Sequence, residues 1–490
     1  MWKSICLLGA LALVLGIPTG GYAVDEARMQ QLEQQLQDMQ NAMSSMQGEL
    51  QSLRAEQKQE QEAEQEQARR QNVLAEEVDK LRTSLTVPDF QPLSMEDSRY
   101  GLGPAASKIY GVSQGLSIGG YGEAYYRKDV SDKSRSDRDT TDYLRFVLYT
   151  GYKFTDRIIL NAELEFEHAS TSTGGSVSVE FAYLDFLMWD WANFRAGMLL
   201  APLGIVNELH EPVFFNGVER PEVERRIIPS TWRENGIGLF GELLPGLEYR
   251  LYAMNALEGA ASNTSACTPD DDGNCVTKPS LKLKEHLRST RQKGGEAMAE
   301  DIAFAARLDY TPMLNLKFGG SVYTGKSTHD SQYFECVDGS CGKVNLPGAR
   351  LTIWDLHALY SWQGLEARAL FAMSHLKDSD ELNRIGGGGK IAKEMYGFYT
   401  ELAYDIMPLV LGTTQQQLSP FVRFSYIDQH AEMAADWDAQ GRYEHRIWTT
   451  GVSYKPHPNV VLKVDYRNFD TVDNDNERED EVNFGIGFVF

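Results

Sequence analysis

The sequence predicts an antiparallel transmembrane β-barrel of about 16 strands, preceded by an N-terminal α-helical coiled coil. Three observations predict this all-β class. Apolar residues recur every three or four positions before residue 88, and every second position after residue 113, which are the periods of helix and strand. Phe490 ends a segment of alternating apolar residues, as in a barrel's last strand. Short and long connections alternate between the expected strands, as they do in outer-membrane barrels.

Composition excludes other classes. The 490 residues are 42% hydrophobic, but the mature chain has no apolar run long enough for a spanning helix. A β-barrel exposes only alternate residues to lipid, so its average hydropathy stays polar. The net charge of -23 argues against a nucleic-acid partner, which requires a basic surface.

Residues 1–23 have the pattern of a signal peptide. Lys3 precedes an apolar stretch from Ile5 to Ile17, and the small residue Ala23 provides a cleavage site. The mature chain is therefore expected to leave the cytoplasm.

Residues 24–87 are expected to form a coiled coil in the periplasm, followed by a linker at 88–113. Leucine and methionine occupy a seam at alternating steps of three and four, which continues through a polar middle to Pro88. A lone amphipathic helix and a disordered tether are the alternatives. Self-association is expected, and with it contact with periplasmic components or peptidoglycan.

Residues 114–490 are expected to form the barrel. The alternating segments are 115–128, 141–154, 156–168, 176–188, 192–200, 234–243, 246–256, 301–311, 314–325, 351–362, 364–376, 395–406, 417–428, 446–455, 459–469 and 480–490. Every second connection between successive strands is short, with one longer exception at 407–416. An even number of strands places both chain ends on the periplasmic side.

The polar residues that alternate with the lipid-facing set are expected to line the lumen. They carry both signs of charge, so they predict no strong ion preference. A barrel of this size is expected to hold water, which would solvate them. The basic members are Arg145, Arg195, Arg250, Arg307, Lys317, Arg368, Arg423, Lys463 and Arg467.

The segment 201–233 is both apolar and densely charged. We expect it to fold into the barrel, with its apolar side on the wall and its charges toward the pore; an external or trimer-contacting loop is the alternative. Its expected constriction residues are Glu219, Arg220, Glu222, Glu224, Arg225, Arg226, Trp232 and Arg233.

Four cysteines remain after signal removal, in two closely spaced pairs: Cys267 with Cys275, and Cys336 with Cys341. Two short disulfide loops are the simplest use in an oxidising compartment. A zinc site and free thiols remain as alternatives.

Three motif matches lack the structural context they need. The segment 320–327 fits a phosphate-binding loop and 236–241 a dinucleotide fingerprint, but no helix follows either. The segment 111–115 imitates a nucleophile elbow without a preceding strand. The histidines show no metal-binding spacing, so the sequence predicts no metal site, no cofactor and no enzyme. A basic patch at 282–293 is expected to be solvated or to contact anions.

Four short runs carry a family resemblance: Asn193 to Met198, Pro202 to Gly204, Glu219 with Arg220, and Arg233 to Gly238. Together they resemble the phosphate-selective porin O and P family. The resemblance implies a sixteen-stranded trimeric channel with a constricting third external loop. It also implies pore roles for Arg195, Glu219, Arg220 and Arg233.

The favoured function is a passive outer-membrane porin for small hydrophilic or anionic solutes, phosphate among them. Its expected surroundings are outer-membrane lipid and lipopolysaccharide. The alternative is a structural barrel that sheathes a partner such as a multihaem cytochrome, or anchors the envelope through its coiled coil.

Overall fold

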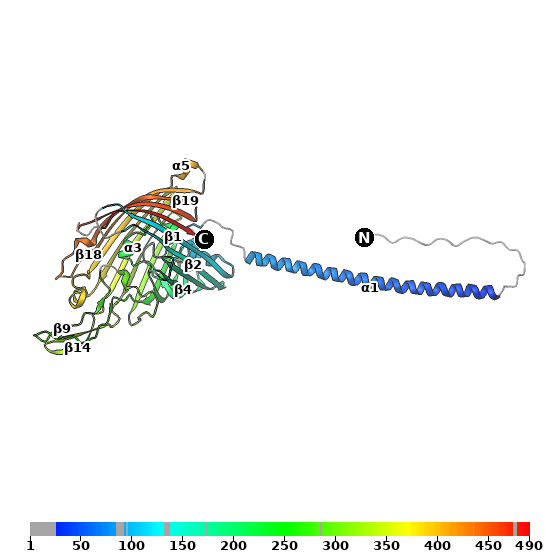
Figure 1. The fold of residues 1–490 in the computed structure, drawn as a ribbon, viewed down its shortest axis with the longest axis horizontal. Coiled ribbons are helices and arrows are strands. Elements are labelled where there is room, and N and C mark those ends of the chain that lie inside the picture. The colour runs from blue at the N-terminus through cyan, green and yellow to red at the C-terminus, as the bar shows by residue number, and fades with distance from the viewer. Residues whose placement is uncertain are drawn as a thin grey trace. The chain divides into compact units, whose positions relative to one another are not determined.

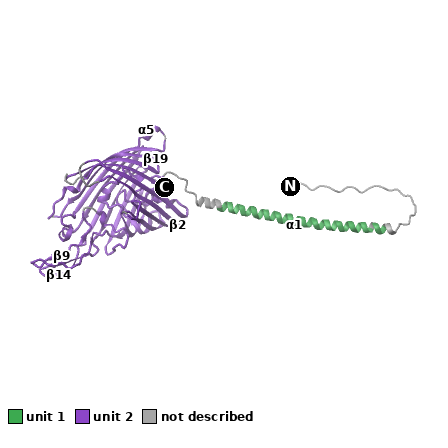
Figure 2. Cartoon of the chain, viewed as in Figure 1, with its two compact units in different colours: residues 1–91 green, residues 92–490 purple. Residues whose placement is uncertain are grey.

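The computed structural model describes residues 26–84, 93–94, 97–131, 138–172, 174–284, 287–412, 414–434, 436–473 and 478–490. The chain divides into two units, residues 1–91 and 92–490 (Figure 2). The expected signal peptide at 1–23 lies outside the described residues.

The described part of the first unit is the helix α1, Glu26–Ser84, of 59 residues. At 1.5 Å per residue it is about 90 Å long. The apolar seam lies open to solvent in the single chain: Leu36, Met39 and Leu50 are each more than half exposed. Helix formation thus follows the expected pattern, and the association of seams stays a prediction.

The second unit is a closed antiparallel barrel (Figure 1). Each strand pairs with its neighbours in chain order, and β1 closes the ring by pairing with β21. The sixteen strands found among the described residues are β1 Gly115–Asp129, β2 Thr140–Thr155, β3 Ile158–Glu167, β4 Ser176–Trp189, β5 Ala192–Leu200, β6 Arg233–Leu244, β7 Leu247–Asn255, β11 Ile302–Met313, β12 Leu316–Gly325, β15 Leu351–Trp362, β16 Leu365–Leu376, β17 Glu394–Tyr404, β18 Gln417–Glu432, β19 Glu444–His457, β20 Val460–Thr471 and β21 Glu481–Val489. The predicted transmembrane barrel is confirmed.

Strand β21 shows how the alternating pattern separates the two faces. Phe484 and Ile486 are each 47% exposed on the outside, whereas Asn483 and Val489 are buried inside. Because successive side chains point to opposite faces, one strand supplies both a lipid-facing row and a lumen row. No helix among the described residues is long and apolar enough to cross a membrane.

The connections fall into two classes at the two ends of the barrel. One end carries two-residue turns such as Asp190–Trp191, and a longer exception that contains α5, Met407–Leu411. The other end carries the long loops. Their elements are η2 Pro212–Phe214, α3 Val223–Arg226, β8 Ala260–Ala261, β9 Cys275–Val276, β10 Ser280–Leu281, η3 Leu287–Thr290, β13 Gln332–Val337, β14 Ser340–Asn345, α4 Ser379–Leu382, η4 Asn383–Gly387 and η5 Gly441–Tyr443.

Two disulfides staple the long loops. Cys267 is bonded to Cys275, and Cys336 to Cys341. The two bridges meet in one small sheet, because β13 pairs with both β9 and β14. The loops after β7 and β12 are thereby joined to each other.

Residues 104–111, expected to belong to a linker, instead form the buried helix α2, Pro104–Gly111. It packs inside the barrel against β1, β2 and β3, near the end with the short turns. Asn161 on β3 donates a hydrogen bond of 3.0 Å to the Ala106 carbonyl. Gly151 on β2 leaves room for the helix, because a Cβ there would lie 2.7 Å from Ile109. The sequence pattern missed α2 because eight residues are too few to show a helical period.

Candidate functional site

The loop between β5 and β6, residues 201–232, lies inside the barrel and is almost entirely buried. Glu224 holds the loop together from within. Its carboxylate accepts hydrogen bonds from the backbone N–H of Ile205 at 2.8 Å and Val206 at 2.5 Å, and from the Tyr399 hydroxyl at 2.7 Å. The loop is therefore a packed element bound to the opposite wall. We call it the lumen loop.

Glu222 is the centre of one charged cluster between the lumen loop and the wall. Its carboxylate lies 2.9 Å from Arg467 on β20, 3.2 Å from Arg226, and 3.5 Å from both Arg225 and Arg478. Burial raises the pKa of this carboxyl, but the four guanidinium groups outweigh burial and hold the pKa well below its usual range. Glu222 is thus ionised and shared among four cations.

A second cluster connects the lumen loop to β17 and β18. Arg423 forms an ion pair of 2.6 Å with Glu401. The same arginine donates a hydrogen bond of 2.5 Å to the Asn216 carbonyl, and the Asn216 amide donates one of 3.1 Å to Glu401. Arg423 and Glu401 of the wall therefore both bind Asn216 of the lumen loop.

A third cluster spans β7, β11 and β15. Asp309 pairs with Arg250, with Arg307 at 2.8 Å and with His357 at 2.9 Å. On the loop side, Asp355 accepts a hydrogen bond of 3.0 Å from the Gly204 backbone N–H. The start of the lumen loop is thereby fixed to the wall.

These contacts correct the expectation that water solvates the lining cations. Seven of the nine predicted lining cations are buried, and Lys317 and Arg368 are half-buried. Arg145 pairs with Glu123 at 2.8 Å, and Arg195 with Asp185 at 2.7 Å. The lumen loop and α2 exclude solvent from these side chains, and the buried arginines form ion pairs in place of hydration. The sequence identified the inward face but had no means to identify what fills it.

The eight expected constriction residues divide by environment. Arg225, Arg226 and Glu219 are half-buried, whereas Trp232 is fully buried against Tyr323, at 4.7 Å between ring centroids. Trp232 thus anchors the loop rather than facing a pore. Of the others, Glu222 is the centre of the first charged cluster, and Glu224 accepts the hydrogen bonds described above. Arg233 forms an ion pair of 2.6 Å with Glu180, and Arg220 is buried.

A polar cavity of about 380 Å³ lies beside the lumen loop, where residues 288–295 cover the ends of β3 to β6. Its basic lining residues are Arg233, Arg288, Arg291 and Lys293, and its acidic ones are Glu165, Glu167 and Glu180. Part of the basic patch noted in the sequence at 282–293 therefore faces the barrel.

The electrostatics of this cavity favour negative charge. Burial, together with neighbouring arginines such as Arg291, lowers the pKa of Arg288 to about 9. Burial and Arg233 lower the pKa of Arg291 to about 10, although Glu180 and other nearby carboxylates oppose that shift. Within the described part of the chain, neither side chain forms an ion pair with a carboxylate. A bound anion would relieve that repulsion.

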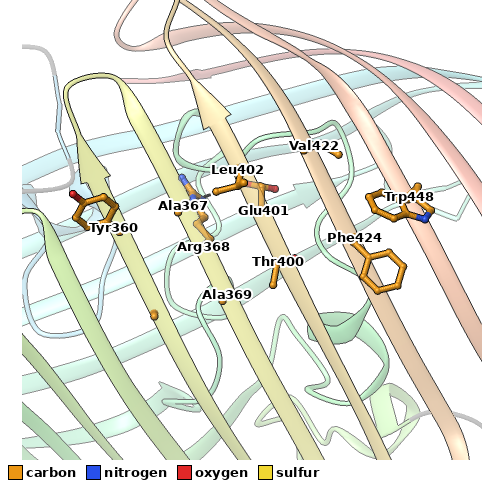
Figure 3. Close-up of a pocket in the computed structure, with 11 residues that line it drawn as sticks. Tyr360, Ala367, Arg368, Ala369, Thr400, Glu401, Leu402, Val422, Phe424 and Trp448 are labelled. Atoms are coloured by element: carbon orange, nitrogen blue, oxygen red, sulfur yellow. Dashed lines mark ion pairs between the residues drawn. The ribbon is translucent and has the colours of Figure 1, made fainter.

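A hollow of about 520 Å³ lies on the outer face of the barrel across β15 to β19 (Figure 3). Ala367 and Ala369 leave the space, and Phe424 and Trp448 flank it. These residues alternate with lumen-facing Arg368, so the hollow opens toward lipid and is separate from the lumen.

No protein-family model matches the chain. An uncharacterized protein of Aquifex aeolicus (strain VF5) is 34% identical over 400 residues, which cover 79% of this chain and 82% of that protein. Similar solved structures include Salmonella typhi OmpF in complex with daunomycin, at 12% identity and a TM-score of 0.48 over 77% of this chain and 98% of that one. The outer membrane channel DcaP of Acinetobacter baumannii is 14% identical, with a TM-score of 0.43 over 76% of this chain and 97% of that one.

Proposed function

The chain belongs to the same family as the uncharacterized Aquifex aeolicus protein, and we propose that it is an outer-membrane channel for small hydrophilic solutes. The observation that carries this proposal is the lumen loop, which narrows a sixteen-stranded transmembrane barrel with charged side chains. A purely structural barrel has no need of a charged loop at its centre. The half-buried charges of Arg225, Arg226 and Glu219 are the expected constriction.

The cavity beside the lumen loop supports a preference for anions. Two of its three carboxylates are already bound, Glu180 by Arg233 at 2.6 Å and Glu165 by Arg145 at 3.2 Å. Arg288 and Arg291 form no ion pair with a carboxylate in the described part of the chain. Guanidinium groups of this kind bind carboxylates and phosphates in a bidentate manner. Phosphate, which the family resemblance suggested, is one candidate solute.

The proposed assembly is a homotrimer in outer-membrane lipid and lipopolysaccharide, with α1 in the periplasm. Support comes from the apolar seam of α1, which an isolated helix leaves exposed. Contact with peptidoglycan or another periplasmic component is part of this proposal.

A closed structural barrel is the second candidate, and the burial of the lumen charges favours it. Both α2 and the lumen loop occupy the interior, and the wall arginines are paired with carboxylates. Such a barrel would serve as an anchor for the coiled coil and would not conduct.

Planar-bilayer recording in a salt gradient separates the two candidates. If the protein is a channel, we expect stepwise conductance and a reversal potential that shows a preference for anions. The double variant Arg288→Gln with Arg291→Gln should reduce this anion preference. Lys278→Gln with Lys284→Gln is the matched control, because both lysines are exposed elsewhere in the same loop. Absence of conductance supports the closed barrel. Conductance that responds equally to both double variants refutes the anion site.

A further inference from the structure

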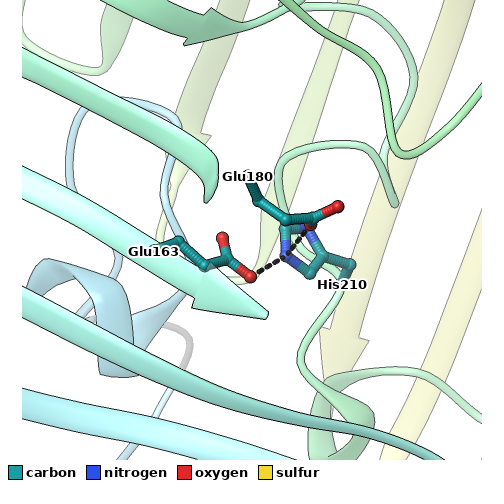
Figure 4. Close-up of side chains that lie close together, drawn as sticks. All are labelled: Glu163, Glu180 and His210. Atoms are coloured by element: carbon teal, nitrogen blue, oxygen red, sulfur yellow. Dashed lines mark hydrogen bonds and ion pairs between the residues drawn. The ribbon is translucent and has the colours of Figure 1, made fainter. Parts of the chain in front are cut away.

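Glu163 on β3, Glu180 on β4 and His210 in the lumen loop meet inside the barrel (Figure 4). All three side chains are at most 2% exposed. Each offers one ligand atom, and these atoms lie within 4.8 Å of one another. Glu180 follows Glu163 by 17 positions and His210 follows Glu180 by 30, so their spacing matches no metal-binding motif.

The separations fit the coordination sphere of a small metal ion. His210 Nε2 lies 3.3 Å from Glu163 Oε1 and 3.8 Å from Glu180 Oε2. Ligands bound to tetrahedral zinc at about 2.0–2.2 Å stand about 3.3–3.6 Å apart. The two histidine separations are therefore close to those values, and the two carboxylate ligand atoms lie within 4.8 Å of each other.

One buried oxygen is unsatisfied. Glu163 Oε2 has no hydrogen-bond partner within the described ranges, whereas the Glu180 carboxylate also contacts the Glu165 carboxyl. Arg233 is bound to Oε1 of Glu180, and Arg145 to Glu123 and Glu165. An unsatisfied buried carboxylate oxygen is costly, so it points to a missing cation.

The histidine is oriented as metal ligands are. His210 Nδ1 lies 3.2 Å from the Asn207 carbonyl, an acceptor, so Nδ1 must carry the proton. In a neutral ring, Nε2 then presents a lone pair to the two carboxylates. Metal-binding histidines are held in the same way, by a hydrogen bond from the second nitrogen to a carbonyl or carboxylate.

A β-bulge brings Glu180 into the group. Glu163 pairs with Phe181 and Leu164 with Val179, which leaves Glu180 as the extra residue in β4. Glu180 and Phe181 are consequently both buried inside the barrel, although they are adjacent in sequence. Bulges re-aim side chains in this way next to functional sites.

We propose that Glu163, Glu180 and His210 bind one divalent transition-metal ion, with zinc favoured by the nitrogen and oxygen ligand set. Solvent would complete the coordination. Tyr121, whose ring lies 5.8 Å from His210, has a hydroxyl without a partner in the described residues and is available to bond that solvent. Glu180 also lines the 380 Å³ cavity, which provides the entry path.

The metal would cross-link the lumen loop to β3 and β4. This role goes beyond solute passage, since it holds whether the barrel conducts or not. Zinc content is measured on the detergent-purified full chain after EDTA dialysis, reloading with Zn²⁺ and removal of free ion. We expect one zinc per chain by elemental mass spectrometry.

Glu163→Gln, Glu180→Gln and His210→Gln should each weaken zinc binding by at least about tenfold, because each removes one of three ligands. Glu401→Gln is the matched control, since it also removes a buried carboxylate that pairs with arginine, on β17. It should keep one zinc. Heat-modifiable mobility on gels reports whether each variant still forms the barrel.

If the variants do not fold, cobalt loading of the unmodified protein tests the proposed metal site. X-ray absorption should then show one imidazole and carboxylate oxygens around cobalt. Failure of the unmodified chain to hold zinc, retention of zinc by folded ligand variants, or cobalt without imidazole overturns the proposal.

Discussion

Replacement of Glu222 by glutamine tests whether the lumen loop controls ion flow. Glu222 is the one carboxylate within ion-pair distance of all four guanidinium groups of Arg225, Arg226, Arg467 and Arg478 in the described structure. Glutamine keeps the size of the side chain and removes its charge. The lumen cluster thereby gains one positive charge with little change in packing.

The energetic cost can be bounded from the geometry. A pair of charges about 4 Å apart contributes about 4 kcal/mol at an effective dielectric constant of 20, but desolvation offsets much of it. Loss of one partner from a buried cluster costs about 3–5 kcal/mol. Glu219 and Glu481 remain nearby to pair with Arg225 and Arg467, so we expect a value near the lower bound.

Reversal potential in a salt gradient and unfolding in denaturant are the two measurements. Glu222→Gln should shift the reversal potential toward anion selectivity and lower the unfolding free energy. Glu432→Gln is the control, because Glu432 is exposed and, among the described residues, its ion pair is with the partly exposed Lys393, which predicts little change in the unfolding free energy. Equal behaviour of the two variants would refute the assignment of Glu222 to the ion path.

The pH dependence has a definite sign. The pKa of Glu222 is lower in the folded chain than its unfolded value of about 4.3, so its contribution is fully present above about pH 4.3. The contribution is lost as pH falls through the folded pKa. Glu222→Gln should therefore differ most from the unmodified protein at neutral pH and converge with it in strong acid.

Three further outcomes are expected. Unreduced protein should yield no alkylated Cys267 or Cys336, and recovery of either thiol would refute the disulfides. A peptide of residues 25–87 should sediment as a helical oligomer, since its seam is otherwise exposed; a monomeric, unfolded peptide would make the segment a tether. Gly151→Val should displace α2, because its Cβ would lie 2.7 Å from Ile109, and should raise conductance, whereas an unchanged conductance would show that α2 does not obstruct the path.

The repeating patterns of this chain determined its architecture, because they depend only on neighbouring residues. Alternation along 480–490 indicated both the lipid face and the lumen face, and both are observed in β21. The rhythm of short and long connections indicated an antiparallel barrel. The short spacing of the cysteines likewise favoured the two pairs that are bonded, and the apolar and charged residues of 201–233 favoured a loop inside the wall.

Only the tertiary structure decided which charges meet. Arg467 binds Glu222 across 245 positions of sequence, and Asn216 binds Glu401 across 185. No local pattern encodes such pairs, because they depend on the register of separate strands and on the path of the lumen loop. The same holds for α2 within the lumen and for the bulge that turns Glu180 toward His210. Sequence periodicity specifies which face a side chain occupies, whereas its partner depends on how the closed barrel packs around its contents.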